Sequence, residues 1–146
     1  MANPGKSLFD EVGGRPTLER VHKIFYDKLW SHPWLKGFFV KLNQKLLENQ
    51  QTDFMSGAMG GPDNYAGKLP VPAHKHMYIT AEQFDLRSSI LKQSLIEAGV
   101  APDLREKWLK IDGAFKGKMV KKSPAECEGR YKTESILIVE KPKGYS

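Results

Sequence analysis

Apolar residues recur at helical spacing along most of the chain. In the first long segment, Leu18, Val21, Phe25 and Leu29 fall three or four positions apart, which places them on one face of a helix. No segment before residue 130 alternates polar and apolar residues with a period of two. The spacing predicts four longer helices, over residues 16–31, 42–59, 81–98 and 102–119. The body of the protein is therefore predicted to be all-α.

Capping residues mark the ends of several predicted elements. Thr80-Ala81-Glu82-Gln83 has the capping-box pattern, and Gly99 is well placed to end the helix that follows. Gly13-Gly14 ends a short helical turn that begins near Ser7, and Pro33 begins another tight turn. The chain is thus predicted to change direction at these points.

Two segments lie outside the long helices. Residues 60–72 contain three prolines and three glycines, which prevents a regular helix, and so long a loop in a small domain is more often functional than not. Residues 121–146 form an extension with a short β-branched run at Ile136-Leu137-Ile138-Val139. A plain ordered tail is the simplest interpretation, and an arm on the body or on a second subunit is the alternative. We therefore divide the chain into a domain over residues 1–120 and an extension over 121–146.

Length, charge, apolar runs and cysteine content exclude several classes of protein. The 146 residues suit one domain, and 23 basic against 17 acidic residues give a net charge of +6. The lysines are scattered, so a solvated basic surface is a simpler interpretation than a nucleic-acid or membrane surface, and neither partner is expected. Apolar runs are too short to span a bilayer, and the first six residues lack a signal-peptide core. The single cysteine, Cys127, excludes an internal disulfide, and a cytoplasmic location is expected.

A polar amide interrupts the apolar face of the second long helix. Gln51 lies one turn from both Leu47 and Met55. A buried amide without partners costs about 1–3 kcal/mol, so Gln51 needs a structural hydrogen bond, a position at the helix edge, or a ligand.

The four histidines are the candidate metal ligands. Four helices make a thin core that an apolar cofactor would complete, and histidine is the usual ligand for haem iron. His22 is interpreted as a boundary residue and His32 as a turn residue. His74 and His76 lie at the edge of an apolar patch, where a structural role and a His-x-His zinc or copper site are alternatives, although no nearby Cys, Asp or Glu completes such a site. No hydrolase motif, phosphate loop or dinucleotide fingerprint occurs.

Several motifs occur in a fixed order between about Ser7 and Val120. They are Leu8-Phe9 with Val12-Gly13-Gly14, Phe25-Tyr26, Phe38-Phe39, Gly60-Gly61-Pro62 with Tyr65 and Gly67, and Ala73-His74-Lys75-His76-Met77-Tyr78-Ile79-Thr80 with Phe84. In this order they resemble the truncated haemoglobins, and the first group most closely. The resemblance implies a two-over-two globin sandwich around haem b, followed by the extended C-terminal tail.

The resemblance also implies residue roles. His74, selected over His76 by a gapless alignment, would bind the iron, and Tyr26 and Gln51 would hydrogen-bond a ligand on the distal side. The remaining haem contacts would be Phe39, Leu47, Met55, Tyr65, Lys68, Ile79 and Phe84, with Tyr65 and Lys68 near the propionates. Arg87 departs from the family, which often has an apolar residue or tryptophan there. Its charge must reach a propionate or solvent, or the local helix must be rotated.

These roles lead to competing functional hypotheses. The first is a haem protein with five-coordinate iron that binds oxygen, nitric oxide and carbon monoxide. Its use would be nitric oxide dioxygenation with a separate reductase, or reversible oxygen storage, delivery or sensing, and weak peroxidase activity is a third alternative. The second is a haem-free basic helical adaptor. Two distal donors predict tight oxygen binding and slow release, and a monomer or weak dimer is expected.

Overall fold

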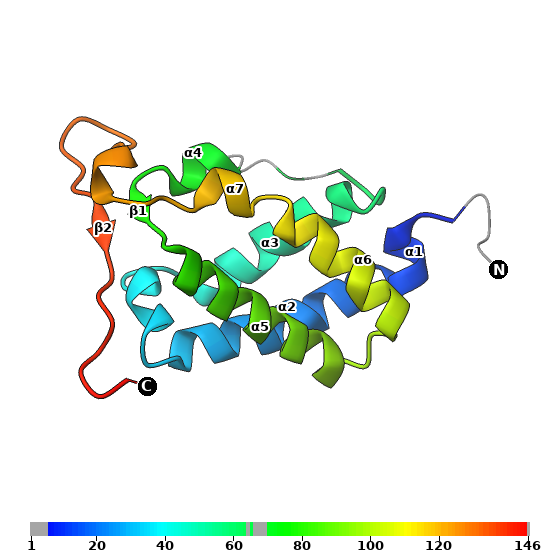
Figure 1. Ribbon diagram of the computed structural model, residues 1–146. Coiled ribbons are helices and arrows are strands. Elements are labelled where there is room, and N and C mark those ends of the chain that lie inside the picture. Colours follow the sequence, from blue (N-terminus) through cyan, green and yellow to red (C-terminus); the bar gives the residue numbers. More distant parts are fainter. Residues whose placement is uncertain (1–5, 64, 66–69, 146) are drawn as a thin grey trace.

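The computed structural model describes residues 6–63, 65 and 70–145, and its body consists of two pairs of packed helices. Helix α2 (Gly14–Ser31) packs against α3 (Gln44–Ala58) and α5 (Ala81–Glu97), and α5 packs against α6 (Pro102–Gly113). Figure 1 shows α5 and α6 crossing in front of α2 and α3. The predicted all-α, two-over-two body is confirmed.

The ends of the helices follow the capping residues. Helix α1 (Leu8–Val12) ends at Gly13, whose φ of 110° is in the left-handed region that glycine adopts without strain. Helix α2 begins directly at Gly14, earlier than the predicted start at Pro16. At α5 the capping box of Thr80 and Gln83 forms as predicted, with backbone-to-side-chain hydrogen bonds of 2.9 and 3.1 Å.

Short elements connect the two pairs of helices. The 3-10 helix η1 (Leu35–Phe39) follows α2, and helix α4 (Pro70–His74) leads to strand β1 (Met77–Tyr78). The single helix predicted over residues 102–119 is instead broken into α6 and α7 (Lys116–Met119), which packs against α4. Glycines at 113 and 117 weaken a continuous helix at this point.

The core lies where α2, α5 and α6 meet. Leu18, Phe84, Leu95 and Trp108 are each at most 2% exposed. His22 is also in the core, with 1% exposure, so its interpretation as a boundary residue was wrong. Thr52 of α3 offsets the cost of burying this polar ring, because its hydroxyl lies 2.7 Å from His22 Nδ1 and forms a hydrogen bond with it.

The C-terminal extension folds back on the body, and we call residues 121–145 the C-terminal strap. After the 3-10 helix η2 (Pro124–Glu126), strand β2 (Leu137–Ile138) pairs in parallel with β1, with Met77 opposite Leu137. Figure 1 shows the strap beside β1 at the end of the molecule away from α1. The structure therefore favours the alternative of an arm on the body.

Among the described helices, none is long and apolar enough to cross a membrane.

Candidate functional site

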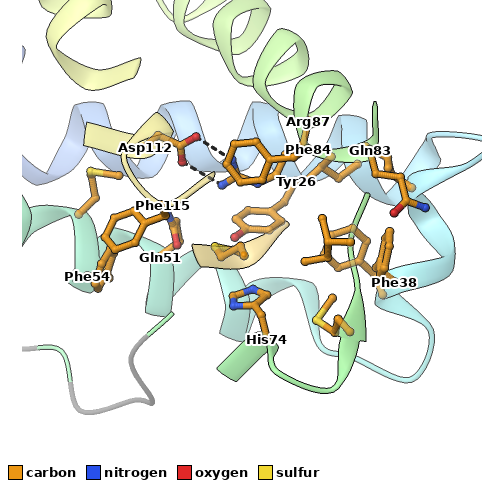
Figure 2. A pocket seen from close by; sticks show the side chains of 17 residues that line it. Tyr26, Phe38, Gln51, Phe54, His74, Gln83, Phe84, Arg87, Asp112 and Phe115 are labelled. Atoms are coloured by element: carbon orange, nitrogen blue, oxygen red, sulfur yellow. Dashed lines mark hydrogen bonds and ion pairs between the residues drawn. The ribbon is translucent and has the colours of Figure 1, made fainter. Parts of the chain in front are cut away.

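A largely apolar cavity lies between the two helix pairs. It has about 910 Å³ of space free of protein atoms, part of it open to solvent. Its apolar wall includes Phe38, Phe39, Met55, Ile79, Phe84 and Phe115. A few polar groups converge on the same space, which is the usual composition of a ligand site (Figure 2).

His74 supplies the imidazole in this cavity. It is the last residue of α4, so the side chain is presented at the point where the helix ends. Figure 2 shows the ring rising from α4 into the space below Tyr26. The carbonyl of His74 accepts a 2.9 Å hydrogen bond from Lys121 Nζ, which also donates to Met77 O at 2.8 Å. The strap therefore fixes the backbone on both sides of the turn that follows His74.

Tyr26 and Gln51 lie across the cavity from His74. Tyr26 comes from α2 and is 9% exposed, with its ring edge-on to Phe39 at 6.3 Å between centroids. Burial raises the pKa of the Tyr26 hydroxyl to about 12, so the group remains a protonated donor at neutral pH. Gln51 comes from the facing helix α3 and is only partly buried. The amide in the apolar face of this helix is thus accounted for by its position at the cavity.

Arg87 and Asp112 form an ion pair in the wall of the cavity. Arg87 Nη1 and Nη2 lie 2.7 and 3.0 Å from the two carboxylate oxygens of Asp112. The guanidinium carbon also lies 5.1 Å from the ring centroid of Phe25 and 5.5 Å from that of Phe84. The sequence led to the expectation that this charge reaches a propionate or solvent, or that the local helix is rotated, and it did not indicate a carboxylate partner for Arg87. Asp112 of α6 compensates the charge inside the protein.

Seven of the predicted site residues line the cavity together. They are Tyr26, Phe39, Gln51, Met55, His74, Ile79 and Phe84. Leu47 packs against the core and Tyr65 against the ring of Phe54, but neither is among the described residues that line the cavity. Lys68 lies outside the described residues. His76 is buried elsewhere, and His74 alone of the two faces the cavity.

Asp112 and Gln83 also belong to this site, although neither was predicted as a site residue from the sequence. Asp112 lies one helical turn after Trp108, on the buried face of α6, and this spacing was the available signal. Gln83 was recognised only as a capping residue, but it also lines the cavity and its Nε2 donates to Val139 O at 2.9 Å. The sequence pattern alone cannot distinguish a polar residue that only caps a helix from one that also lines a cavity.

The donor set favours haem over a metal held by protein ligands alone. Within the part of the chain that the structure describes, no three His, Cys, Asp or Glu side chains gather to hold a metal ion. One imidazole in a large apolar cavity fits haem, which brings four of the iron ligands with it.

A helical sandwich around an apolar cavity with an inward histidine defines a globin. The bacterial-like globin family matches residues 7–121, and the chain belongs to this family. Globins of this family bind haem and gaseous ligands through it. The match ends at Lys121, so the strap beyond this first residue lies outside the family match.

Comparison with known proteins places the chain among the truncated haemoglobins. A group 1 truncated haemoglobin of Mycolicibacterium paratuberculosis is 35% identical over 94 residues, covering 64% of this chain and 69% of that protein. One from Tetrahymena thermophila is 31% identical over 98 residues, covering 67% and 81%. The crystal structure of the Fe(III) truncated haemoglobin of Tetrahymena pyriformis superposes with a TM-score of 0.74 at 28% identity, covering 80% of this chain and 100% of that chain.

Proposed function

We propose that the protein binds oxygen and other diatomic gases at a haem b held by His74. The observation that carries this proposal is the arrangement of one imidazole opposite a phenol and an amide in a single apolar cavity. When bound, haem supplies an iron that takes up diatomic gases in its ferrous state and can be oxidised to the ferric state. Phe39, Met55, Ile79 and Phe84 would contact the macrocycle and exclude water from it.

Tyr26 and Gln51 are the groups that would hold a bound gas. The phenol is kept protonated by its raised pKa, and the amide N–H is a second donor from the facing helix. Hydrogen bonds in an enclosed apolar site stabilise a ligand that gains negative charge on binding more than they stabilise the empty site. At about 1 kcal/mol each, two such bonds would slow oxygen release by about an order of magnitude or more.

Slow release would favour oxygen chemistry over oxygen delivery. Nitric oxide dioxygenation, the conversion of oxygen and nitric oxide to nitrate, would need one electron from outside in each turnover. The globin match over residues 7–121 is to a haem-binding domain, which binds the gas but is not itself a source of electrons. We therefore propose that a separate reductase supplies the electron. Reversible oxygen storage or sensing is the alternative use of the same cavity.

Absorption spectra test the haem assignment. The purified protein is reconstituted with haemin and recorded in the ferric form, after reduction, and under carbon monoxide. The wild-type protein should give a strong haem band that sharpens with carbon monoxide, and His74→Ala should lose or alter it. His76→Gln is the matched control, because His76 does not line the cavity. A protein that stays colourless, or a band that depends on His76 instead, would contradict the assignment.

Oxygen dissociation rates test the two donors. Tyr26→Phe and Gln51→Leu should each raise the rate about fivefold, because each removes one hydrogen bond of about 1 kcal/mol. Tyr65→Phe removes a phenol that does not line the cavity and should change the rate least. The donor roles are wrong if neither Tyr26→Phe nor Gln51→Leu changes the rate.

A further inference from the structure

Two opposite charges are built into the wall of the proposed gas-binding cavity. Arg87 of α5 and Asp112 of α6 both line it, and two hydrogen bonds of 2.7 and 3.0 Å join them. Figure 2 places the pair above Tyr26, on the side of the cavity away from His74. A buried pair of this kind often adds little to stability compared with apolar residues of similar size. The position of the pair in the cavity wall suggests instead that it acts on a ligand bound in the cavity.

The cationic end of this pair is the more accessible end. The side chain of Arg87 keeps 25% of its surface exposed, whereas Asp112 keeps 6%. Arg87 lines the cavity, so its guanidinium group is within reach of a ligand bound there. The pair uses two of the five N–H donors of the guanidinium group, which leaves others for an acceptor in the cavity.

The charge of Arg87 reaches Tyr26 more strongly than the charge of Asp112 does. Burial is the main reason that the pKa of Tyr26 is raised, and the Arg87 guanidinium opposes this rise more than the Asp112 carboxylate adds to it. The guanidinium is also the member of the pair that has N–H donors left over at the cavity wall. A negatively charged ligand in contact with Arg87 would therefore be stabilised beyond the hydrogen bonds that a neutral ligand receives.

We propose that Arg87, held in place by Asp112, makes the cavity selective for small anions such as azide, fluoride and nitrite as ligands of ferric haem. This inference rests on the proposed function, since it requires haem held by His74. Arg87 is then a specificity-determining residue, and Asp112 is a positioning residue that limits how much positive charge the ligand meets.

Ligand titrations of the ferric holoprotein test this proposal. Azide and fluoride are the anionic probes, and imidazole is the neutral one. Replacing both charges in Arg87→Gln/Asp112→Asn should weaken azide and fluoride binding about tenfold or more, the usual effect of losing a charged hydrogen-bond partner. Imidazole affinity should stay within about a factor of three, because neutral binding does not draw on the charge. Equal changes for azide and imidazole, or no change for azide, would overturn the proposal.

Single variants separate charge from packing. Arg87→Lys keeps a cation and should retain most of the preference for azide over imidazole, whereas Arg87→Gln should lose it. Asp112→Asn removes the counter-ion and should tighten azide binding. If Asp112→Asn weakens azide as much as Arg87→Gln does, the pair only shapes the cavity and the proposal is wrong. These single variants decide the outcome if the double variant does not fold.

Haem-free protein gives a readout that does not depend on the loaded site. Circular dichroism and thermal unfolding of the double variant should match the wild-type apoprotein, since both lack an unpaired buried charge. A large loss of apoprotein stability in the double variant would assign the pair to folding and overturn a role in selectivity. A wild-type protein that takes up no haem would refute the proposed function itself, and its missing absorption band distinguishes that result from lost anion preference.

Discussion

His22 is a titratable side chain that the fold keeps uncharged. It is 1% exposed, hydrogen-bonded to Thr52 and edge-on to Trp108, with 5.9 Å between ring centroids. The pKa of His22 is lowered from 6.5 to about 3, and burial is the main cause. The nearby Arg87 charge also lowers this pKa, and its effect is larger than the opposite effect of the Asp112 charge. The folded protein therefore keeps His22 as a neutral imidazole over most of the acidic pH range.

Acid sensitivity follows from this buried histidine. Below pH 6.5 the unfolded chain binds a proton at His22 that the folded chain does not bind until the pH approaches 3. Stability should therefore fall as the pH decreases through this window, by about 1.4 kcal/mol per pH unit from this group. His22→Gln should flatten the slope when urea unfolding of the apoprotein is measured between pH 6 and 4. His32→Gln, at a surface helix end, should flatten it less, and equal slopes in wild type and His22→Gln would refute the assignment.

Single residues were predictable from the sequence where their neighbours signalled them. His74 was identified through the ordered motifs around it, and Gln51 through the apolar face that it interrupts. The core position of His22 and the Arg87–Asp112 pair were not predicted, because each depends on a partner from another helix, at residues 52 and 112. Contacts between helices are set by packing, which spacing within one helix does not contain.

At the scale of elements, the C-terminal strap serves as a hydrogen-bonding partner for the segment after His74. Lys121 donates to the carbonyl oxygens of His74 and Met77, and its own backbone N–H donates to Ile79 O at 2.9 Å. The backbone N–H groups of Glu128 and Leu137 donate to the carbonyls of Lys75 and His76 at 2.9 and 2.8 Å. The strap thus holds the backbone on which the proposed iron ligand is mounted.

Removing the strap should loosen haem binding. A protein ending at residue 120 loses these hydrogen bonds, so it should lose haem to an excess of a haem-scavenging apoglobin several-fold faster than the full chain. A protein ending at residue 140 keeps β2 and loses only the end of the strap, where Lys141 pairs with Glu82 at 2.9 Å and Tyr145 contacts Trp34. This control should release haem at nearly the wild-type rate. Equal rates for all three proteins would show that the strap does not support the haem site.

Element boundaries could be predicted where a capping residue fixes them locally. The Thr80 capping box, Gly13 and Gly99 all appear at the ends of helices as expected. The pairing of β1 with β2 could not be predicted, because each strand has two residues and the partners lie 60 positions apart in the sequence, from Met77 to Leu137. A strand so short has no alternation pattern, and its partner is chosen by the folded body.

At the scale of the whole molecule, the cavity leaves the core incomplete without a ligand. The space between the helix pairs is lined by apolar side chains from several elements, and part of it is open to solvent. The overall fold class was predictable, because helical periodicity runs through the whole body. The size of the cavity was not, since it depends on how the helix pairs are spaced.

Haem should therefore stabilise the whole fold. Holoprotein and apoprotein are compared by thermal unfolding, and a ligand at a hundred times its dissociation constant adds about 2.7 kcal/mol, or several degrees for a domain of this size. His74→Ala should reduce the difference between the two melting temperatures. Identical melting temperatures of the wild-type protein with and without haemin would contradict a cavity that haem completes.

The position of the strap in the sequence also sets the order in which the site is made during translation. Every described residue that lines the cavity precedes residue 120, and β2 begins only at Leu137. Because a chain leaves the ribosome from its N-terminus, the complete globin part is synthesised before β1 has its partner strand. A newly made chain therefore passes through a stage in which all the cavity residues are present and the segment after His74 is still unpaired.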